Sequence, residues 1–472
     1  MNSTGVALTQ SAIPAHGHQG SGRPVLLVMY HYHPSNSIGA RRCTAVARHL
    51  SASGRRVIIV SAFDGSGADP SDVDATRTAI PVAEPDRRAL DFLIRCKRAL
   101  HATLNRMPKL RRQVRPTTHA AEPDIHRSPG FARRVIQLLQ VIDEHKQWAW
   151  RAARAGLRAA RQNDVAAVVC SAPPWSSTIA AIWIAKKLGV PLIVDFRDPW
   201  TDWPDYDARP LPLTRRLNRH LETMVLRRAS AVICTTPNLA RRLVVRLPEL
   251  ADKTHVAMNA YDSLEARSKM TGHRLAILFA GELYMSRNPM PFLEALEQLL
   301  ARPGIDSSRV SLTMVGYRTP FWEQQLGEWL KGKRCASVVR MLPPVPMSEI
   351  AAIVDTATLL LNFNQRSPLT IPAKTFEQFG QGREIMVLCE QDSATAQVTA
   401  GLRGVTRIDA DDTPAIAEAL SDIYQRHALL NTLTPPDPNQ IARYARRIQN
   451  DRIAAVVNSV CDGLVPRPAP QD

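Results

Sequence analysis

The feature that most constrains the fold is an unbroken apolar run near the start of the chain, followed by a loop, a helix and a second apolar run. The first run covers residues 25–30, and a loop at 31–39 separates it from a helical pattern over 40–53. Gly54 ends this pattern, and the second run covers 57–61. Apolar runs without polar alternation are typical of parallel strands buried on both faces, so the segment predicts a β-α-β unit.

The same alternation continues along the chain and divides it into two halves. In the first half, further strand-like runs lie at 165–170, 192–196 and 231–235. After a polar stretch at 263–273, six more lie at 275–280, 310–315, 338–342, 358–362, 385–388 and 405–408. A length of 472 residues suffices for two domains. We therefore expect an α/β fold in which two Rossmann-like domains face each other across a cleft, with ligands beyond the carboxyl ends of the strands.

The positions of these runs predict the domain boundaries. We expect an N-terminal domain over 24–265, a C-terminal domain over 266–435, and a helix over 436–463 that packs back across both. The polar ends, 1–23 and 464–472, are expected to be disordered.

One segment of the N-terminal domain, 87–161, is helical in pattern and strongly basic. It holds 18 Lys/Arg and five Asp/Glu, which is +13 of the chain's net charge of +17. Its Arg residues interleave with apolar residues, Trp148 and Trp150 among them, which suits docking on an anionic membrane surface. The alternative is a solvated insertion. Nucleic acid is not expected as a partner, because no nucleic-acid-binding module occurs.

The cysteines and the apolar segments indicate the compartment. Seven Cys without a CxxC pair argue against a disulfide framework or a zinc site. The first 23 residues lack the apolar region of a signal peptide, and no run of about 18 apolar residues occurs. We expect a cytoplasmic protein, either free or peripheral on the inner face of the cytoplasmic membrane.

Loops that follow the N-terminal strands carry the first candidate binding groups. Gly39 either brings backbone N–H groups to a phosphate or simply starts a helix. His31 lies in the same loop, where a lone histidine is more often a surface residue than a base. In the loop at 171–177, Ser176 and Ser177 are expected mainly as helix N-caps.

A cluster of charges and aromatic residues follows the run at 192–196. Asp195 and Asp198 flank Arg197, with Trp200 and Trp203 close behind. Carboxylates that accept hydroxyl hydrogen bonds, together with rings that stack on sugar faces, suit a polyol ligand. The alternative is an Arg–Asp pair with a structural role.

The C-terminal half offers groups for a phosphate and a ribose. Gly281 lets the backbone approach a phosphate that Arg287 can neutralise. Lys374 and Glu377 lie three residues apart on one face of a short helix. They form either a local ion pair or a site in which Lys374 meets a pyrophosphate and Glu377 accepts ribose hydroxyls.

Together these residues resemble the nucleotide-sugar-dependent glycosyltransferases of the GT-B fold, in particular the family 4-like group, over roughly residues 24–463. The first loop is similar to that family's "FPP…GG" loop. The other matching segments are Ser171-Ala-Pro-Pro-Trp175, Val194-Asp-Phe-Arg-Asp-Pro-Trp200, Thr235-Thr-Pro-Asn238, Met258-Asn-Ala-Tyr-Asp262, Phe279-Ala-Gly281 and Ile371-Pro-Ala-Lys-Thr-Phe-Glu377.

The resemblance implies an enzyme that moves a sugar, with retention at the anomeric carbon, to a polysaccharide or lipid-linked acceptor in cell-surface or exopolysaccharide biosynthesis. The donor is a UDP- or GDP-linked co-substrate, with no other cofactor and no metal. The C-terminal domain binds the donor and the N-terminal domain the acceptor. The implied donor-binding residues are Gly39, Gly281, Arg287, Lys374 and Glu377; the acceptor residues are His31, Trp175, Arg197 and Asp198; and the catalytic residues are Asp198 and Arg287.

Three positions depart from the family pattern. The glutamate expected eight residues before Glu377 is Leu369, the arginine expected after Gly281 is Glu282, and the glycine of the "PNG" segment is Ala260. These departures keep two alternatives open. One is a non-catalytic GT-B binding or scaffold protein, and the other is a nucleotide-sugar epimerase.

Overall fold

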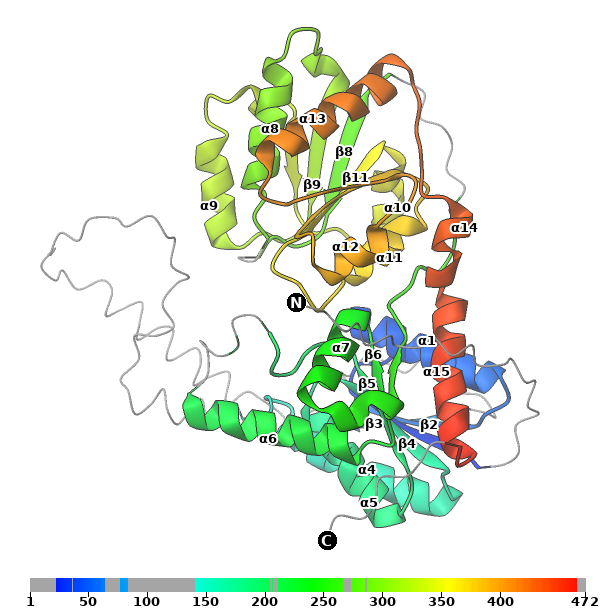
Figure 1. Cartoon of the computed structure of the whole chain (residues 1–472). Helices are drawn as coiled ribbons and strands as arrows, with labels where there is room; N and C mark the ends of the chain where they lie inside the picture. Colours follow the sequence, from blue (N-terminus) through cyan, green and yellow to red (C-terminus); the bar gives the residue numbers. More distant parts are fainter. Residues whose placement is uncertain are drawn as a thin grey trace, which may run out of the picture.

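The computed structural model describes residues 23–35, 37–63, 77–83, 141–203, 206, 211–265, 273–284 and 287–464. It shows two α/β domains stacked one above the other (Figure 1). Both predicted chain ends lie almost wholly outside these ranges. Residues 84–140, which include the larger part of the basic segment, also lie outside these ranges.

The N-terminal domain contains a seven-stranded parallel sheet in the order β3-β2-β1-β4-β5-β6-β7. Its strands are β1 (Val25–Met29), β2 (Val57–Phe63), β3 (Arg77–Ala83), β4 (Ala167–Ala172), β5 (Leu192–Phe196), β6 (Ala231–Cys234) and β7 (Thr254–Val256). The order reverses at β1, which pairs with β2 on one side and β4 on the other. The strands β3 and β7 were not predicted. β7 is only three residues long, and β3 contains Pro81 and is largely half-buried or exposed.

Two layers of helices cover this sheet, and β1 shows the alternation. Leu26 and Val28 face a core made with α4 (Lys146–Asn163), α5 (Ser176–Leu188), α6 (Pro212–Arg228) and α7 (Pro237–Arg246). Val25, Leu27 and Met29 face a second core made with α1 (Ile38–Ala52) and the C-terminal helix α15 (Arg446–Cys461). Both faces of β1 are therefore dry, as its unbroken apolar sequence predicted.

Helix α4 corrects the last part of the predicted basic insertion over 87–161, residues 146–161. Trp148 on this helix is fully buried, and a Cβ at Gly156 would come within 2.9 Å of Ile184 in α5. Trp150, by contrast, is 58% exposed. The arginines of α4 lie on the outer side of a helix whose Ala, Gly, Leu and Trp residues form the core, so this stretch is part of the domain.

The C-terminal domain has a six-stranded parallel sheet in the order β10-β9-β8-β11-β12-β13. Its strands are β8 (Leu275–Ala280), β9 (Val310–Val315), β10 (Val339–Leu342), β11 (Leu359–Asn364), β12 (Glu384–Cys389) and β13 (Val405–Ile408). Its helices are α8 (Met290–Ala301), α9 (Pro320–Trp329), α10 (Met347–Asp355), α11 (Ala373–Phe379), α12 (Ala394–Thr399) and α13 (Thr413–Tyr424). The predicted α/β fold with two Rossmann-like domains is confirmed.

The chain then returns to the N-terminal domain through α14 (Pro438–Ile441) and α15, which runs beside α1 (Figure 1). Ile453 and Val457 of α15 are buried against the N-terminal sheet. Within the described ranges, no helix is both long and apolar enough to cross a bilayer.

Candidate functional site

A cleft of about 1480 Å³ lies between the two domains, at the carboxyl ends of the strands of both sheets. Loops after β1, β5, β8 and β9 line it, together with the start of α11. The volume exceeds the roughly 300–1,000 Å³ of typical small-ligand sites, so there is room for two substrates at once.

The N-terminal wall of the cleft contains the first turn of α1. Ser37 caps this helix, and its Oγ accepts from the Ala40 N–H at 3.2 Å. The Arg197 guanidinium, which donates to the carbonyls of Ala172 and Pro173, lies directly against Gly39. A Cβ at Gly39 would overlap its Nη1 atom. A larger residue at this position would therefore displace the guanidinium. A cation that packs on a helix N-terminus favours an anion.

His31 lines the same wall. Its Nδ1 lies 3.5 Å from Ser37 Oγ. Burial, reinforced by Arg197 and then His145, lowers the pKa of His31 to about 4. The imidazole is therefore neutral at neutral pH and offers hydrogen bonds rather than a positive charge.

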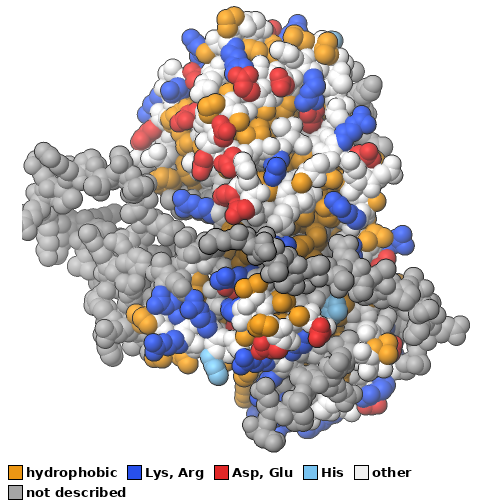
Figure 2. Space-filling view, in the orientation of Figure 1, with side chains coloured by type: hydrophobic (Ala, Val, Ile, Leu, Met, Phe, Trp, Pro, Cys, Tyr) orange, Lys and Arg blue, Asp and Glu red, His pale blue; other side chains and the backbone are white. Residues whose placement is uncertain are grey.

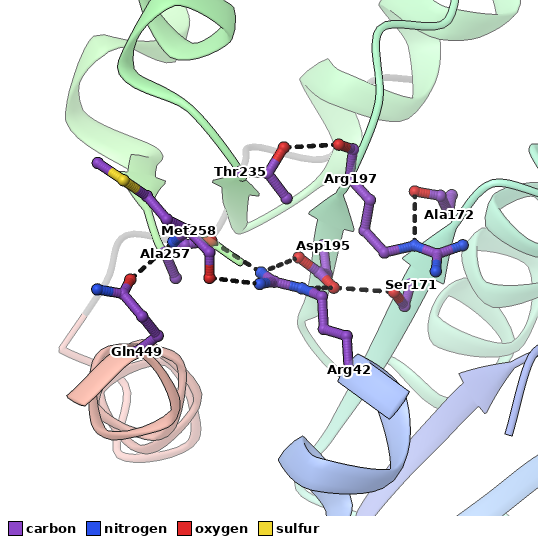
Figure 3. A network of polar contacts seen from close by, with 9 residues as sticks. All are labelled: Arg42, Ser171, Ala172, Asp195, Arg197, Thr235, Ala257, Met258 and Gln449. Atoms are coloured by element: carbon purple, nitrogen blue, oxygen red, sulfur yellow. Dashed lines mark hydrogen bonds and ion pairs between the residues drawn. The ribbon is translucent and has the colours of Figure 1, made fainter. Parts of the chain in front are cut away.

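The two aspartates of the 195–198 segment have different roles. Asp195 is buried and pairs with Arg42 of α1 through bonds of 2.8 and 3.0 Å, and it also accepts from Ser171 at 2.8 Å (Figure 3). It therefore forms the structural pair that the sequence left open, although with Arg42 rather than Arg197. Asp198 instead lines the cleft, where burial raises its pKa.

Trp175 is a correction to the predicted acceptor residues. Its ring stacks on Trp200, with centroids 5.0 Å apart and planes at 2°, and it is only 9% exposed. It packs in the core of the N-terminal domain and is not part of the cleft wall. The aromatic residues that do line the cleft are Trp203, Tyr206, Tyr284 and Tyr317.

The C-terminal wall brings together the four predicted donor residues of that domain. The Lys374 amine is buried above the Phe279 ring, with Nζ 4.4 Å from the ring centroid and 3.2 Å from where a Cβ at Gly281 would lie. Its Nζ makes no hydrogen bond to any described residue. Burial, and then Arg287, lower the pKa of Lys374 well below its usual value.

Arg287 lies at the edge of this group, near the position where the family arginine is replaced by Glu282. Its guanidinium lies 4.3 Å from the Tyr284 ring centroid and donates to the carbonyl of Glu282 at 2.8 Å. The side chain thus returns to the strand end from five residues further along the chain.

Glu377 forms an ion pair that the sequence did not predict. Its Oε1 accepts from Arg41 Nη1, on α1 of the opposite domain, at 2.8 Å. The alternative of a local Lys374–Glu377 pair is therefore not what the structure shows. A partner 336 residues away leaves no signal in a single sequence.

The position of the missing family glutamate is occupied by a contact between the domains. Thr236 Oγ1 donates to the Leu369 carbonyl at 2.6 Å, and Asn238 donates to the Pro368 carbonyl at 2.9 Å. Arg366 and Ser367 line the cleft just before this contact. In the described part of the chain, no cluster of three His, Cys, Asp or Glu side chains has the geometry to hold a metal.

Comparison with known proteins bears on the fold. Residues 39–260 match the family model described as "Glycosyl transferase 4-like domain". Among solved structures, Anabaena HepE in complex with UDP and glucose is 11% identical with a TM-score of 0.56, and the match covers 93% of this chain and 100% of that one.

Two synthases superpose similarly. Sucrose-phosphate synthase from Thermosynechococcus elongatus is 12% identical with a TM-score of 0.54, covering 94% of this chain and 97% of that one. The UDP-forming α,α-trehalose-phosphate synthase from Burkholderia vietnamiensis is 11% identical with a TM-score of 0.55, covering 96% and 100%. At these identities the likeness establishes the fold. A comparison with curated proteins found no match.

Proposed function

Because residues 39–260 match the family model of a glycosyl transferase 4-like domain and the chain has a GT-B-like fold, we propose that the protein transfers a hexosyl group from a UDP- or GDP-linked sugar to a polysaccharide or lipid-linked acceptor. The observation that carries the proposal is Lys374. A buried amine with no hydrogen-bond partner among the described residues, directed at the interdomain cleft, is costly unless a ligand completes it.

The donor diphosphate fits between the two walls of the cleft. On the C-terminal side, Lys374 and Arg287 supply positive charge, and Gly281 keeps the strand end open. On the N-terminal side, the first turn of α1 at Gly39 supplies backbone N–H groups. Glu377, one helical turn after Lys374, then accepts hydrogen bonds from the ribose hydroxyls.

The chemistry proposed is electrostatic. As the glycosidic bond to the nucleotide breaks, negative charge develops on the leaving diphosphate. The Arg287 cation stabilises this charge, together with the Lys374 amine, which the bound anion keeps protonated. Asp198 lies on the opposite wall and accepts a hydrogen bond from a hydroxyl of the acceptor or the transferring sugar. Its raised pKa suits a group that exchanges a proton with such a hydroxyl. Retention of configuration is carried over from the resemblance.

We propose that the acceptor binds on the N-terminal side, near His31, Arg197 and the Trp203 ring, which is 42% exposed. An aromatic face suits a sugar acceptor of a glycan or glycolipid.

We also propose that the protein is cytoplasmic and attaches peripherally to an anionic membrane surface. The basic sequence before α4 supports this proposal. Lys and Arg side chains also gather on the lower domain over the region of α6 (Figure 2).

A non-catalytic binding protein is the second candidate, and the contact at Leu369 favours it. The loop that carries the sugar-binding glutamate in the family is here held to the N-terminal domain by Thr236 and Asn238. Nucleotide binding without turnover of any donor sugar would support this second function over the first.

The test is a thermal-shift screen of nucleoside diphosphates against the wild type and Glu377→Ala. We expect UDP or GDP to raise Tm, because a ligand at about 100 times its Kd adds about 2.7 kcal/mol of stability. Glu377→Ala should remove the shift, whereas Glu328→Ala, on the remote helix α9, should keep it. If no nucleoside diphosphate shifts the wild type, the proposed function is wrong.

A further inference from the structure

Arg41 crosses the cleft. It projects from the first turns of α1 in the N-terminal domain, and its Nη1 donates to Glu377 Oε1 of α11 in the C-terminal domain at 2.8 Å. The two side chains are 29% and 26% exposed, so the pair is partly shielded from water. A partly buried charge-assisted hydrogen bond is stronger than a surface ion pair.

The helix that presents Arg41 is held firmly at its next residue. Arg42 pairs with buried Asp195 and donates to the carbonyls of Ala257 and Met258, each at 2.9 Å (Figure 3). These carbonyls belong to the segment that leaves the N-terminal domain. Gln449 of α15 accepts from the Met258 N–H at 2.7 Å. The helix that presents Arg41 is thus fixed to the segment that leaves the N-terminal domain. Any change in the relative position of the two domains would therefore change the distance from Arg41 to Glu377.

The cross-domain pair also affects Lys374. Lys374 and Glu377 share one face of α11, where an i,i+3 ion pair is the local alternative. With Arg41 bound to the carboxylate, Lys374 Nζ has no hydrogen-bond partner among the described residues. Arg41 therefore keeps the Lys374 amine free for an anion while it holds one oxygen of Glu377.

We propose that Arg41 is a positioning residue that couples cleft closure to donor recognition. It holds Oε1 of Glu377 from the opposite domain, so that Oε2 faces the ribose and Lys374 remains available to the diphosphate. The donor site is then complete only when the domains are closed, and the donor stabilises the closed state. This inference rests on the proposed donor site.

The experiment measures UDP and GDP affinity by titration calorimetry, with the full chain, for wild type, Arg41→Ala and Arg41→Lys. We expect Arg41→Ala to weaken binding about 10-fold. In the wild type, UDP or GDP should decrease the radius of gyration measured by X-ray scattering, and Arg41→Ala should remove this decrease. Arg41→Lys, which retains the charge and can reach the same oxygen, should recover most of the affinity. Arg48→Ala, at an exposed position of the same helix, is the matched control and should bind as the wild type does.

A double-mutant cycle shows whether Arg41 acts through Glu377. In a Glu377→Gln background, Arg41→Ala should cause little further loss; an additive loss would mean that Arg41 contacts the nucleotide itself and would overturn the proposal. Tighter binding by Arg41→Ala would also overturn it, since the pair would then compete with the donor. A wild type that binds nucleotide together with an unaffected Arg41→Ala would refute this inference alone. A wild type that binds neither nucleotide would refute the proposed function and this inference with it.

Discussion

Substituting Asp195 by Asn tests the buried network shown in Figure 3. The side chains of Asp195 and Arg42 are only 6% and 5% exposed, and two hydrogen bonds join them. Replacing the carboxylate leaves a buried guanidinium without its counter-charge, which typically costs about 3–5 kcal/mol. For a cooperative unit of 150–250 residues, each kcal/mol lowers Tm by about 2–4 °C. The N-terminal domain of Asp195→Asn should therefore unfold about 6–20 °C below the wild type in differential scanning calorimetry.

The pH dependence gives the same variant a second signature. Burial opposes ionisation of Asp195, but Arg42, Arg197 and Ser171 together bring its pKa below the usual 3.8. A carboxyl with a depressed pKa contributes stability above pH 3.8, and this contribution is lost as the pH falls through the pKa of the folded state. The Tm difference between wild type and Asp195→Asn should therefore be full at neutral pH and shrink below pH 4.

Two further variants separate this reasoning from a general effect of mutation. Glu249→Gln breaks a solvent-exposed Arg227 pair and should leave Tm almost unchanged. The double variant Arg42→Met/Asp195→Leu removes both charges and should recover part of the loss. A fall in Tm of less than about 2 °C for Asp195→Asn, or a fall no larger than that of Glu249→Gln, would refute the argument.

The remaining predictions concern the cleft. Gly39→Ala should displace the Arg197 guanidinium and weaken UDP or GDP binding by calorimetry, whereas Gly327→Ala, whose Cβ meets nothing, should be neutral; equal affinities would count against a role for Gly39. An anion beside Lys374 should raise its lowered pKa, so nucleotide binding should take up protons between the pKa values of the free and bound states. Calorimetry in buffers of different ionisation enthalpy measures this uptake, and undiminished uptake by Lys374→Met would contradict it.

The strand positions could be predicted from sequence wherever both faces of the strand are buried. Residues 25–30 and 275–280 are apolar runs, and β1 and β8 lie there. The edge strand β3 was not predicted, because its exposed residues and Pro81 interrupt the apolar pattern. Residues 146–161 of α4 were assigned to the basic insertion, because the many arginines of this helix mask a stripe of small core residues around Trp148.

The sequence predicts which loops form the candidate site, but not the contacts that their residues make. Gly39, Gly281, Lys374 and Glu377 do line one cleft, because the strand ends of two parallel sheets converge there. Their partners were not predictable: the bond from Arg41 to Glu377 joins residues far apart in the sequence. Trp175 and Trp203 have the same chemistry, and only three-dimensional packing decides which of them is buried.

The return of α15 to the N-terminal domain has a consequence for biosynthesis. The apolar face of β1 that contacts Ile453 and Val457 is synthesised more than 400 residues before those side chains exist. Until the last helix leaves the ribosome, the N-terminal domain has one incompletely covered face, and that face is open to chaperones and to other nascent chains. A chain that stops before α15 should therefore lose solubility as a whole, so the final helix acts as a checkpoint on completed translation.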